Sequence, residues 1–204
     1  MKHLFSVSML VVLLIGGCAP ILPAADATNA AQPQETVLPG TTAVATCTGV
    51  LTSPNMEGPY YKAGAPERAS LIEPGMLGTP IRVSGHVFDQ TCTPLTGARV
   101  DFWQADASGA YDNEGYTLRG YVVTDADGAY VIDTIEPGIY PGRPPHVHVK
   151  VFAPDGRELL TTQMYFAGSE DSGDVRAAPD LLAPYLGPDA EGRQQIAFDF
   201  VVRN

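Results

Sequence analysis

The sequence predicts an all-β domain, built as a sandwich or a barrel. Past residue 45, apolar and polar residues alternate in short runs, and Gly, Pro, Asp and Asn interrupt these runs at short intervals. Helical periodicity is scarce, and no segment repeats at a fixed period. About 160 residues follow this point, which is enough for one domain with its own core.

Seven strands account for most of the alternating runs. They are predicted over 81–88, 98–104, 119–124, 129–135, 146–153, 158–166 and 195–203. The Asp-Ala-Asp-Gly segment at 125–128 is predicted to be a hairpin turn, because Asp-Gly supplies the positive φ that tight turns need. One helical turn is allowed over 180–186. Trp103, Phe198 and Phe200 are predicted to pack in the core, the two phenylalanines on one face of the last strand.

Residues 55–80 form a long stretch with little periodic structure. It contains the sequence Glu57-Gly58-Pro59-Tyr60-Tyr61. Long ordered loops in compact domains often serve as lids or cavity walls, so Tyr60 and Tyr61 are candidate substrate contacts. The structural alternative is a coil that covers one sheet edge.

The N-terminal residues predict export. Lys2 precedes an apolar run, and Ile15-Gly16-Gly17-Cys18 resembles a bacterial lipobox, so 1–17 is predicted to be a signal peptide and Cys18 to be lipidated. The alternatives are an ordinary secretory signal or a short membrane anchor, although the run is shorter than the roughly 20 apolar residues that span a bilayer. Residues 18–45 are predicted to be a flexible linker and 46–204 the folded domain. The protein is expected outside the cytoplasm, at the cell surface or in the periplasm, held by its lipid anchor or secreted.

Two cysteines remain once Cys18 is assigned to the lipid. An oxidising compartment favours a disulfide between Cys47 and Cys92. Two independent buried thiols are the alternative.

The formal net charge of −11 argues against nucleic-acid binding, which depends on basic patches. Acidity of this kind mainly favours solubility.

The segment His146-Val147-His148 has the spacing of a metal-binding pair. Residues separated by one position project to the same side of a strand. Tyr140 and Arg143 precede the pair, and phenolic oxygen with neutral imidazole suits a hard ferric ion. Taken alone, each motif has a structural reading, because Pro-Gly-x-Tyr turns commonly pack a ring on the core and an isolated His-x-His is more often structural than metal-binding.

Several short motifs follow one another along the chain. They are Glu-Gly-Pro-Tyr at 57–60, Val-Ser-Gly-His-Val at 83–87, Gly-Ala-Arg-Val-Asp-Phe-Trp-Gln-Ala-Asp at 97–106, Gly-Ala-Tyr at 109–111, Ile-Glu-Pro-Gly-Ile-Tyr at 135–140, Arg-Pro-Pro-His-Val-His at 143–148 and Gln-Met-Tyr-Phe at 163–166. In this combination the domain resembles the intradiol ring-cleavage dioxygenase family, of the protocatechuate 3,4-dioxygenase type. The resemblance covers nearly the whole predicted domain.

The resemblance implies a fold, a cofactor and a reaction. The fold would be a single β-sandwich of mostly antiparallel strands, with long loops and little helix. The cofactor would be non-haem Fe(III). The reaction would cleave a catecholic ring between its two hydroxyl-bearing carbons with both atoms of O2, giving a cis,cis-muconate-type product.

The resemblance also implies roles for individual residues. The implied iron ligands are Tyr111, Tyr140, His146 and His148, with Tyr140 also catalytic because the substrate displaces it. Arg143 would lie over the substrate ring, and Gln163 would line the same cavity. Tyr116 and Tyr121 compete with Tyr111 for the first ligand position, which Tyr111 takes because it completes the Gly-x-Tyr motif.

Two departures from the family pattern stand out. Cys92 occupies a turn position where the family usually has Gly or Ser, which fits a disulfide. The chain lacks the N-terminal helical segment of catechol and hydroxyquinol dioxygenases, which places it closer to the protocatechuate type. Members of the family assemble through β-sandwich interfaces, and for this chain a homo-oligomer such as a dimer and a monomer are both left open. The competing functions are a non-catalytic extracytoplasmic β-sandwich lipoprotein that binds carbohydrate or protein, and a copper or zinc hydrolase or metal carrier.

Overall fold

The computed structural model describes residues 47–139 and 142–204. The predicted signal peptide, the lipidated Cys18, the linker at 18–45 and Tyr140 lie outside the described residues. In the part that the structure describes, no helix is long and apolar enough to cross a bilayer.

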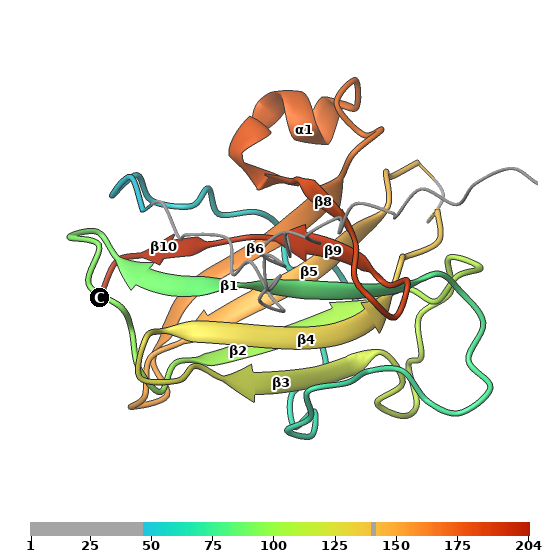
Figure 1. Ribbon diagram of the computed structural model, residues 1–204, viewed down its shortest axis with the longest axis horizontal. Coiled ribbons are helices and arrows are strands. Elements are labelled where there is room, and N and C mark those ends of the chain that lie inside the picture. Colours follow the sequence, from blue (N-terminus) through green and yellow to red (C-terminus); the bar gives the residue numbers. More distant parts are fainter. Residues whose placement is uncertain (1–46, 140–141) are drawn as a thin grey trace, which may run out of the picture. The chain divides into compact units, whose positions relative to one another are not determined.

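Ten strands of the described residues form two mixed five-stranded sheets (Figure 1). The first sheet contains β1 (Pro80–Asp89), β4 (Ala129–Ile135), β8 (Tyr185–Pro188), β9 (Gln194–Ala197) and β10 (Phe200–Val202). The second contains β2 (Arg99–Gln104), β3 (Arg119–Val123), β5 (His146–Phe152), β6 (Glu158–Phe166) and β7 (Leu182–Ala183). Antiparallel pairings are in the majority, so the predicted β-sandwich is confirmed.

Strand β1 organises the first sheet. It pairs antiparallel with β4 on one side, while β9 and β10 run parallel to its first and second halves on the other. The second sheet has the order β3-β2-β5-β6-β7. In Figure 1 the sheet with β1 and β4 lies in front of the sheet with β2, β5 and β6, and α1 (Gly173–Ala177) lies above β8.

The core lies between the sheets and is made by alternate residues of each strand. In β5, Val147, Val149 and Val151 are essentially fully buried and belong to the core cluster. Since successive side chains of a strand point to opposite faces, His146 and His148 project from the other face of the sheet. One strand therefore serves the core with its valines and the candidate site with its histidines.

The outer face of the second sheet is covered by the chain that precedes β1. The backbone N–H of Asn55 donates to the Thr161 carbonyl of β6, at 2.9 Å, and the N–H of Arg68 donates to the Tyr121 carbonyl of β3, at 3.0 Å. Between these points Gly58 passes next to the His148 ring. The long stretch at 55–80 is thus a cover over the histidine face, which explains why both histidines are buried.

The turn at 125–128 differs from its prediction. Gly128 has the expected positive φ of 72°, but the turn connects β3 of one sheet to β4 of the other. The prediction of a hairpin between paired strands was wrong. Instead, β4 pairs with β1 along its whole length, and Tyr130, Ile132 and Ile135 of β4 pack in the core cluster.

The last predicted strand is split into β9 and β10. At the break, Phe198 donates its N–H to the Ser84 carbonyl at 2.9 Å and its own carbonyl accepts the Tyr130 hydroxyl at 2.6 Å. Gly85 makes this approach possible, since a Cβ there would lie 1.8 Å from the Phe198 carbonyl oxygen. Phe198 and Phe200 both lie in the core, as predicted.

The helical turn allowed over 180–186 was placed wrongly. The structure has α1, then a 3-10 turn at Pro179–Leu181, and the chain is extended in β7 and β8. Pro184 disfavours a helical conformation at Ala183, which explains the early end.

The predicted disulfide between Cys47 and Cys92 is present in the structure, with the Cα atoms 5.6 Å apart. Cys92 has a φ of 63°, the left-handed conformation that favours glycine. This conformation accounts for Gly as one of the two residues expected at this turn.

Candidate active site

One row of side chains crosses the outer face of the second sheet. Strand register places Arg119 of β3 opposite Trp103 of β2, Trp103 opposite His148 of β5, and His148 opposite Gln163 of β6. Residues directly opposite on neighbouring strands share a face of the sheet. The row brings residues far apart in sequence to one place beneath the cover.

His146 and His148 face one another in this place. Their Nε2 atoms lie 3.1 Å apart, and the residues are only 4% and 3% exposed. The Nδ1 atom of His146 lies 2.7 Å from the Pro144 carbonyl oxygen, which can only accept a hydrogen bond. Nδ1 of neutral His146 therefore carries the proton, and the lone pair of Nε2 is available to a metal.

Both imidazoles are neutral at neutral pH. Burial lowers the pKa of His146, and burial together with the neighbouring His146 lowers the pKa of His148 to about 2. Nδ1 of His148 is buried near the Met56 backbone without a hydrogen bond of regular geometry. Neutral imidazole is the form that binds metal ions.

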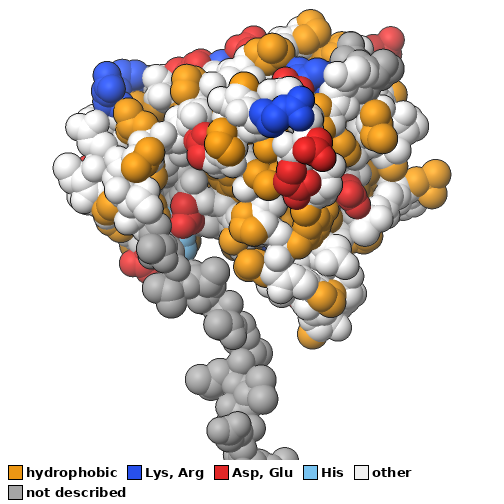
Figure 2. Space-filling model, turned by 90° about the horizontal axis from the view of Figure 1, so that it is seen from above, with side chains coloured by type: hydrophobic (Ala, Val, Ile, Leu, Met, Phe, Trp, Pro, Cys, Tyr) orange, Lys and Arg blue, Asp and Glu red, His pale blue; other side chains and the backbone are white. Residues whose placement is uncertain are grey.

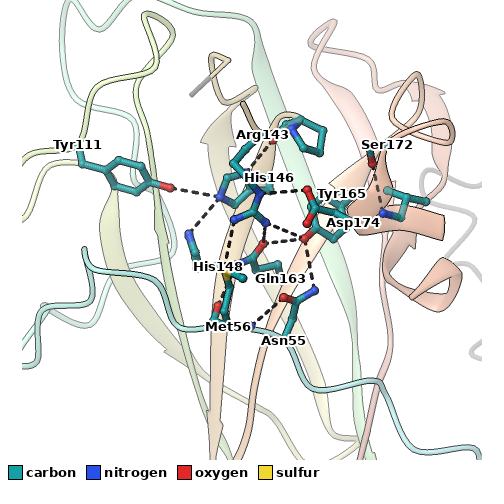
Figure 3. A network of polar contacts seen from close by, with 12 residues as sticks. Asn55, Met56, Tyr111, Arg143, His146, His148, Gln163, Tyr165, Ser172 and Asp174 are labelled. Carbon is teal, nitrogen blue, oxygen red and sulfur yellow. Dashed lines mark hydrogen bonds and ion pairs between the residues drawn. The ribbon is translucent and has the colours of Figure 1, made fainter. Parts of the chain in front are cut away.

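Tyr111 joins the pair from the loop between β2 and β3. Its hydroxyl lies 3.5 Å from Nε2 of His146 (Figure 3). Its ring stacks on that of Tyr60, with centroids 4.2 Å apart. The two competing tyrosines point elsewhere, since the hydroxyl of Tyr116 donates to the Ala63 carbonyl and that of Tyr121 to Glu67. The geometry supports the choice of Tyr111.

These donors fit one hard metal ion. Metal–imidazole bonds of about 2.1 Å at right angles would place two nitrogens about 3 Å apart, close to the observed Nε2 separation. Within the described ranges, no group of three or more His, Cys, Asp or Glu side chains is placed to hold a metal. A tyrosine oxygen beside neutral imidazole is the donor set expected for ferric iron.

Arg143 lies above the histidines in a dense polar network (Figure 3). Its Nε donates to Asp174 at 3.0 Å, and one terminal nitrogen donates to Gln163 at 2.8 Å and to the Tyr165 hydroxyl at 3.0 Å. Among the described residues, the other terminal nitrogen donates to the Met56 sulfur, a weak acceptor, at 3.3 Å. The network thus holds the guanidinium from one side and leaves one nitrogen with donor capacity.

Gln163 is fully buried and serves this network. Its Oε1 accepts from Arg143 and from Tyr165, and its Nε2 donates to the Met56 carbonyl at 2.8 Å. The structure therefore places Gln163 between Arg143 and the cover.

A second polar group lies beside the histidines and was missed from sequence. Lys150, on the same strand face as His148, forms ion pairs with Glu57 at 2.8 Å and Glu158 at 2.7 Å. The Tyr61 hydroxyl donates to Asp101 at 3.2 Å, and burial followed by the nearby Asp101 raises the pKa of Tyr61 to about 12. The alternation of β5 was a signal for Lys150, whereas no local signal marked Asp174, whose contact joins distant segments.

Tyr60 and Tyr61 take different places. Tyr60 stacks on Tyr111 at the edge of the site, while Tyr61 packs edge-on against Trp103, with centroids 4.9 Å apart. A cavity of about 470 Å³ is lined by both tyrosines together with Arg119 and Lys62. A larger cavity, of about 610 Å³, lies between Pro74–Leu77 and 106–108, away from the histidines. The candidate site is assigned to the histidines and not to this cavity, because the side chains that could bind a metal lie together there.

Comparison with known proteins identifies relatives of the chain. The protein-family model described as Dioxygenase matches residues 56–204. The chain belongs to the intradiol ring-cleavage dioxygenase family. The predicted family is therefore confirmed, and the protein is an oxidoreductase of this family rather than a binding module.

Three relatives illustrate the match. Chlorocatechol 1,2-dioxygenase from Rhodococcus opacus is 31% identical over 191 residues, which cover 76% of this chain and 74% of the relative. The beta chain of protocatechuate 3,4-dioxygenase from Burkholderia cepacia is 36% identical over 109 residues, 45% of this chain and 46% of the relative. The dioxygenase domain of a carbohydrate-binding protein fusion from Streptomyces sp. SirexAA-E superposes with a TM-score of 0.69 at 46% identity, covering 76% of this chain and 99% of that domain.

The surface of this dioxygenase mixes charges of both signs. On the face seen in Figure 2, Lys and Arg side chains lie at separate places, with Asp and Glu side chains and hydrophobic ones around them.

Proposed function

We propose that this dioxygenase holds one ferric ion with His146, His148, Tyr111 and Tyr140 and cleaves a catecholic ring between its two hydroxyl-bearing carbons. The product would be of the cis,cis-muconate type. The observation that carries the proposal is the buried histidine pair, with Nε2 atoms 3.1 Å apart and the Tyr111 hydroxyl 3.5 Å from one of them.

When bound, ferric iron would take both oxygens of the catechol and make the ring carbons reactive toward O2. The protein groups supply the rest. The Pro144 carbonyl orients the His146 ring, and Trp103 supports the His148 ring, with centroids 4.8 Å apart. Tyr140 would accept a proton from the incoming diol.

Arg143 would stabilise negative charge that develops on the ring. Its guanidinium is held by Asp174, Gln163 and Tyr165, which leaves the nitrogen beside Met56 to face the substrate. A preorganised donor in a buried site is more effective than the same group in water. Gln163 would then act mainly by orienting Arg143.

The substrate class follows from the relatives' names, which include chlorocatechol and protocatechuate dioxygenases. We propose a catecholic substrate together with O2. The Tyr60 and Tyr61 segment is proposed as a wall of the substrate cavity, because it covers His148 and reaches Tyr111.

We also propose that the enzyme works outside the cytoplasm. The signal at 1–17, lipidation of Cys18 and the linker at 18–45 would tether a domain spanning 46–204 to a membrane surface. The disulfide between Cys47 and Cys92 supports an oxidising compartment.

Metal analysis with oxygen uptake tests the proposal. The purified full chain is loaded with ferric iron and supplied in turn with catechol, protocatechuate and hydroxyquinol. We expect about one iron per chain, a tyrosinate-to-iron absorption band, oxygen consumption with at least one diol, and a ring-opened dicarboxylate. His146→Ala is the matched control and should lose iron and activity together. A protein that takes up zinc but no ferric iron, or consumes no oxygen with any diol, would contradict the proposal.

A further inference from the structure

Arg119 is a buried cation whose hydrogen bonds to the described residues all go to backbone carbonyls. The residue begins β3 and is 2% exposed. Its Nε and one terminal nitrogen donate to the Asp112 carbonyl, at 3.0 and 2.8 Å, and the other terminal nitrogen donates to the Tyr60 carbonyl. Among residues 47–139 and 142–204, it forms no ion pair with a carboxylate. Its hydrogen bonds thus join two separate loops.

Those two loops carry the stacked tyrosines of the site. Asp112 directly follows Tyr111, and the rings of Tyr60 and Tyr111 lie 4.2 Å apart at an interplanar angle of 15°. The Tyr111 hydroxyl in turn lies 3.5 Å from Nε2 of His146. Arg119 therefore holds the backbone on both sides of the stack that presents this hydroxyl.

The loop after Tyr111 is closed on itself. The Asp112 carboxylate accepts the backbone N–H groups of Gly115 at 2.7 Å and Thr117 at 3.0 Å, and these bonds lower the pKa of Asp112. The backbone N–H of Arg119 bonds the Tyr116 carbonyl, at 3.1 Å. The loop is thus a compact unit. The Arg119 side chain joins Asp112, the first residue after Tyr111, to β3, the strand that follows the loop.

A charge in this position is costly. Burial lowers the pKa of Arg119, and a buried charge destabilises a protein unless hydrogen bonds compensate it. An apolar side chain of similar length would fill the space without that cost, but it would leave the Asp112 and Tyr60 carbonyls without their donor. What the guanidinium adds is a fixed distance between the two loops.

We propose that Arg119 is a positioning residue for Tyr111: it ties the backbone after Tyr111 to the segment that carries Tyr60, and so fixes the tyrosine pair at the edge of the metal site. The effect on metal binding rests on the proposed ferric centre. The effect on the tyrosine pair does not.

A double-mutant cycle tests the proposal in the full chain, with ferric iron delivered from a citrate complex. Arg119→Met should lower the affinity for ferric iron about tenfold or more, as expected for loss of an outer-shell partner. In the Tyr111→Phe background the same substitution should change the affinity by less than about twofold, because its target hydroxyl is already absent. Equal losses in both backgrounds would overturn the proposal.

A second readout needs no metal. The Tyr111 contribution to near-ultraviolet circular dichroism is the difference between the wild-type and Tyr111→Phe spectra of the metal-free protein. Arg119→Met should abolish this contribution. If this contribution persists in Arg119→Met, the proposal is overturned. This outcome does not depend on iron binding by the wild type. Failure of the wild type to bind ferric iron would separately refute the proposed ferric centre.

Two further variants serve as a control and as a replacement for Arg119→Met. Arg68→Met removes another arginine that donates to carbonyls of the same region, those of Tyr116 and Arg119, and should leave both readouts unchanged. If Arg119→Met does not fold, Arg119→Lys replaces it in the cycle, since an ammonium group keeps the charge but lacks the fork that spans two carbonyls. The same non-additivity with Tyr111→Phe is then required.

Discussion

Trp103 stacks on His148, with ring centroids 4.8 Å apart and an interplanar angle of 11°. The indole is 2% exposed but lies outside the core cluster, on the sheet face that carries the histidines. Trp103 is therefore buried, as predicted for a core residue, but it lies apart from the cluster between the sheets. Strand register explains the difference, because Trp103 is directly opposite His148 and so shares its face.

This stack leads to a prediction about metal affinity. Trp103→Leu removes the flat surface that holds the His148 ring, and we expect the affinity for ferric iron to fall about two- to tenfold, the value of an aromatic pair. Trp103→Phe keeps a ring and is the control, with a smaller loss. Competition with a chelator measures both. Equal affinities in Trp103→Leu and the wild type would show that the stack does not orient the ligand.

Asp174 should control Arg143 without affecting the metal. Their ion pair, at 3.0 Å, is one of the contacts that fix the guanidinium. Asp174→Asn should lower kcat/KM about tenfold while the iron content stays constant, because the lost interaction acts on the reacting ring. Steady-state oxygen uptake and metal analysis are measured on the same samples.

The control for this experiment is Asp171→Asn, an exposed carboxylate in the same segment. It should leave kcat/KM unchanged. A loss of iron in Asp174→Asn that matches the loss of activity would argue that Asp174 stabilises the ligands instead.

Much of the fold was predictable because its signals are local. Alternation predicted β1, β2, β3, β4, β5 and β6 closely. The errors lie where long-range contacts determine which strands pair and where a strand ends. The Asp-Gly turn at 125–128 was recognised, but its role depends on which sheet β4 joins, and the break between β9 and β10 depends on the approach of Phe198 to Gly85.

The site was predictable to the extent that its residues form motifs. His146, His148, Tyr111, Arg143 and Gln163 belong to motifs of the family and lie together in the structure. The network that holds them was not predictable in the same way. Asp174 and Arg119 act through contacts between segments far apart in sequence, and no local pattern marks such contacts. The alternation of β5 marks the face of Lys150 but not its distant partner Glu57.

The ion pair of Lys150 with Glu158 predicts a change of stability in acid. Burial opposes ionisation of Glu158, but hydrogen bonds from Lys150 and Thr161 outweigh it and lower its pKa. A carboxylate with a lowered pKa in the folded state stabilises the fold above its unfolded pKa, and this contribution is lost as the pH falls through the folded value. Glu158→Gln should therefore lower the melting temperature at pH 7 by about 1–3 °C, as for a partly exposed pair, and the difference should shrink below pH 4.5.

Thermal denaturation across the pH series measures this difference. Glu114→Gln, in an exposed loop, provides the comparison and should show no pH-dependent difference from the wild type. A destabilisation by Glu158→Gln that is constant down to the lowest pH would exclude the ion pair as its source.

The left-handed backbone of Cys92 predicts different outcomes for two ways of removing the disulfide. Loss of the link between residues 45 positions apart should destabilise the domain by about 2–4 kcal/mol. With Cys47→Ser in both proteins, Cys92→Gly should be more stable than Cys92→Ala by about 1 kcal/mol, because glycine adopts a φ of 63° without the steric cost that alanine has there. Urea denaturation of both double variants gives the comparison. If the alanine variant were as stable as the glycine variant, the turn would have relaxed once the bridge was gone, and the conformation of Cys92 would be a consequence of the disulfide rather than of the turn.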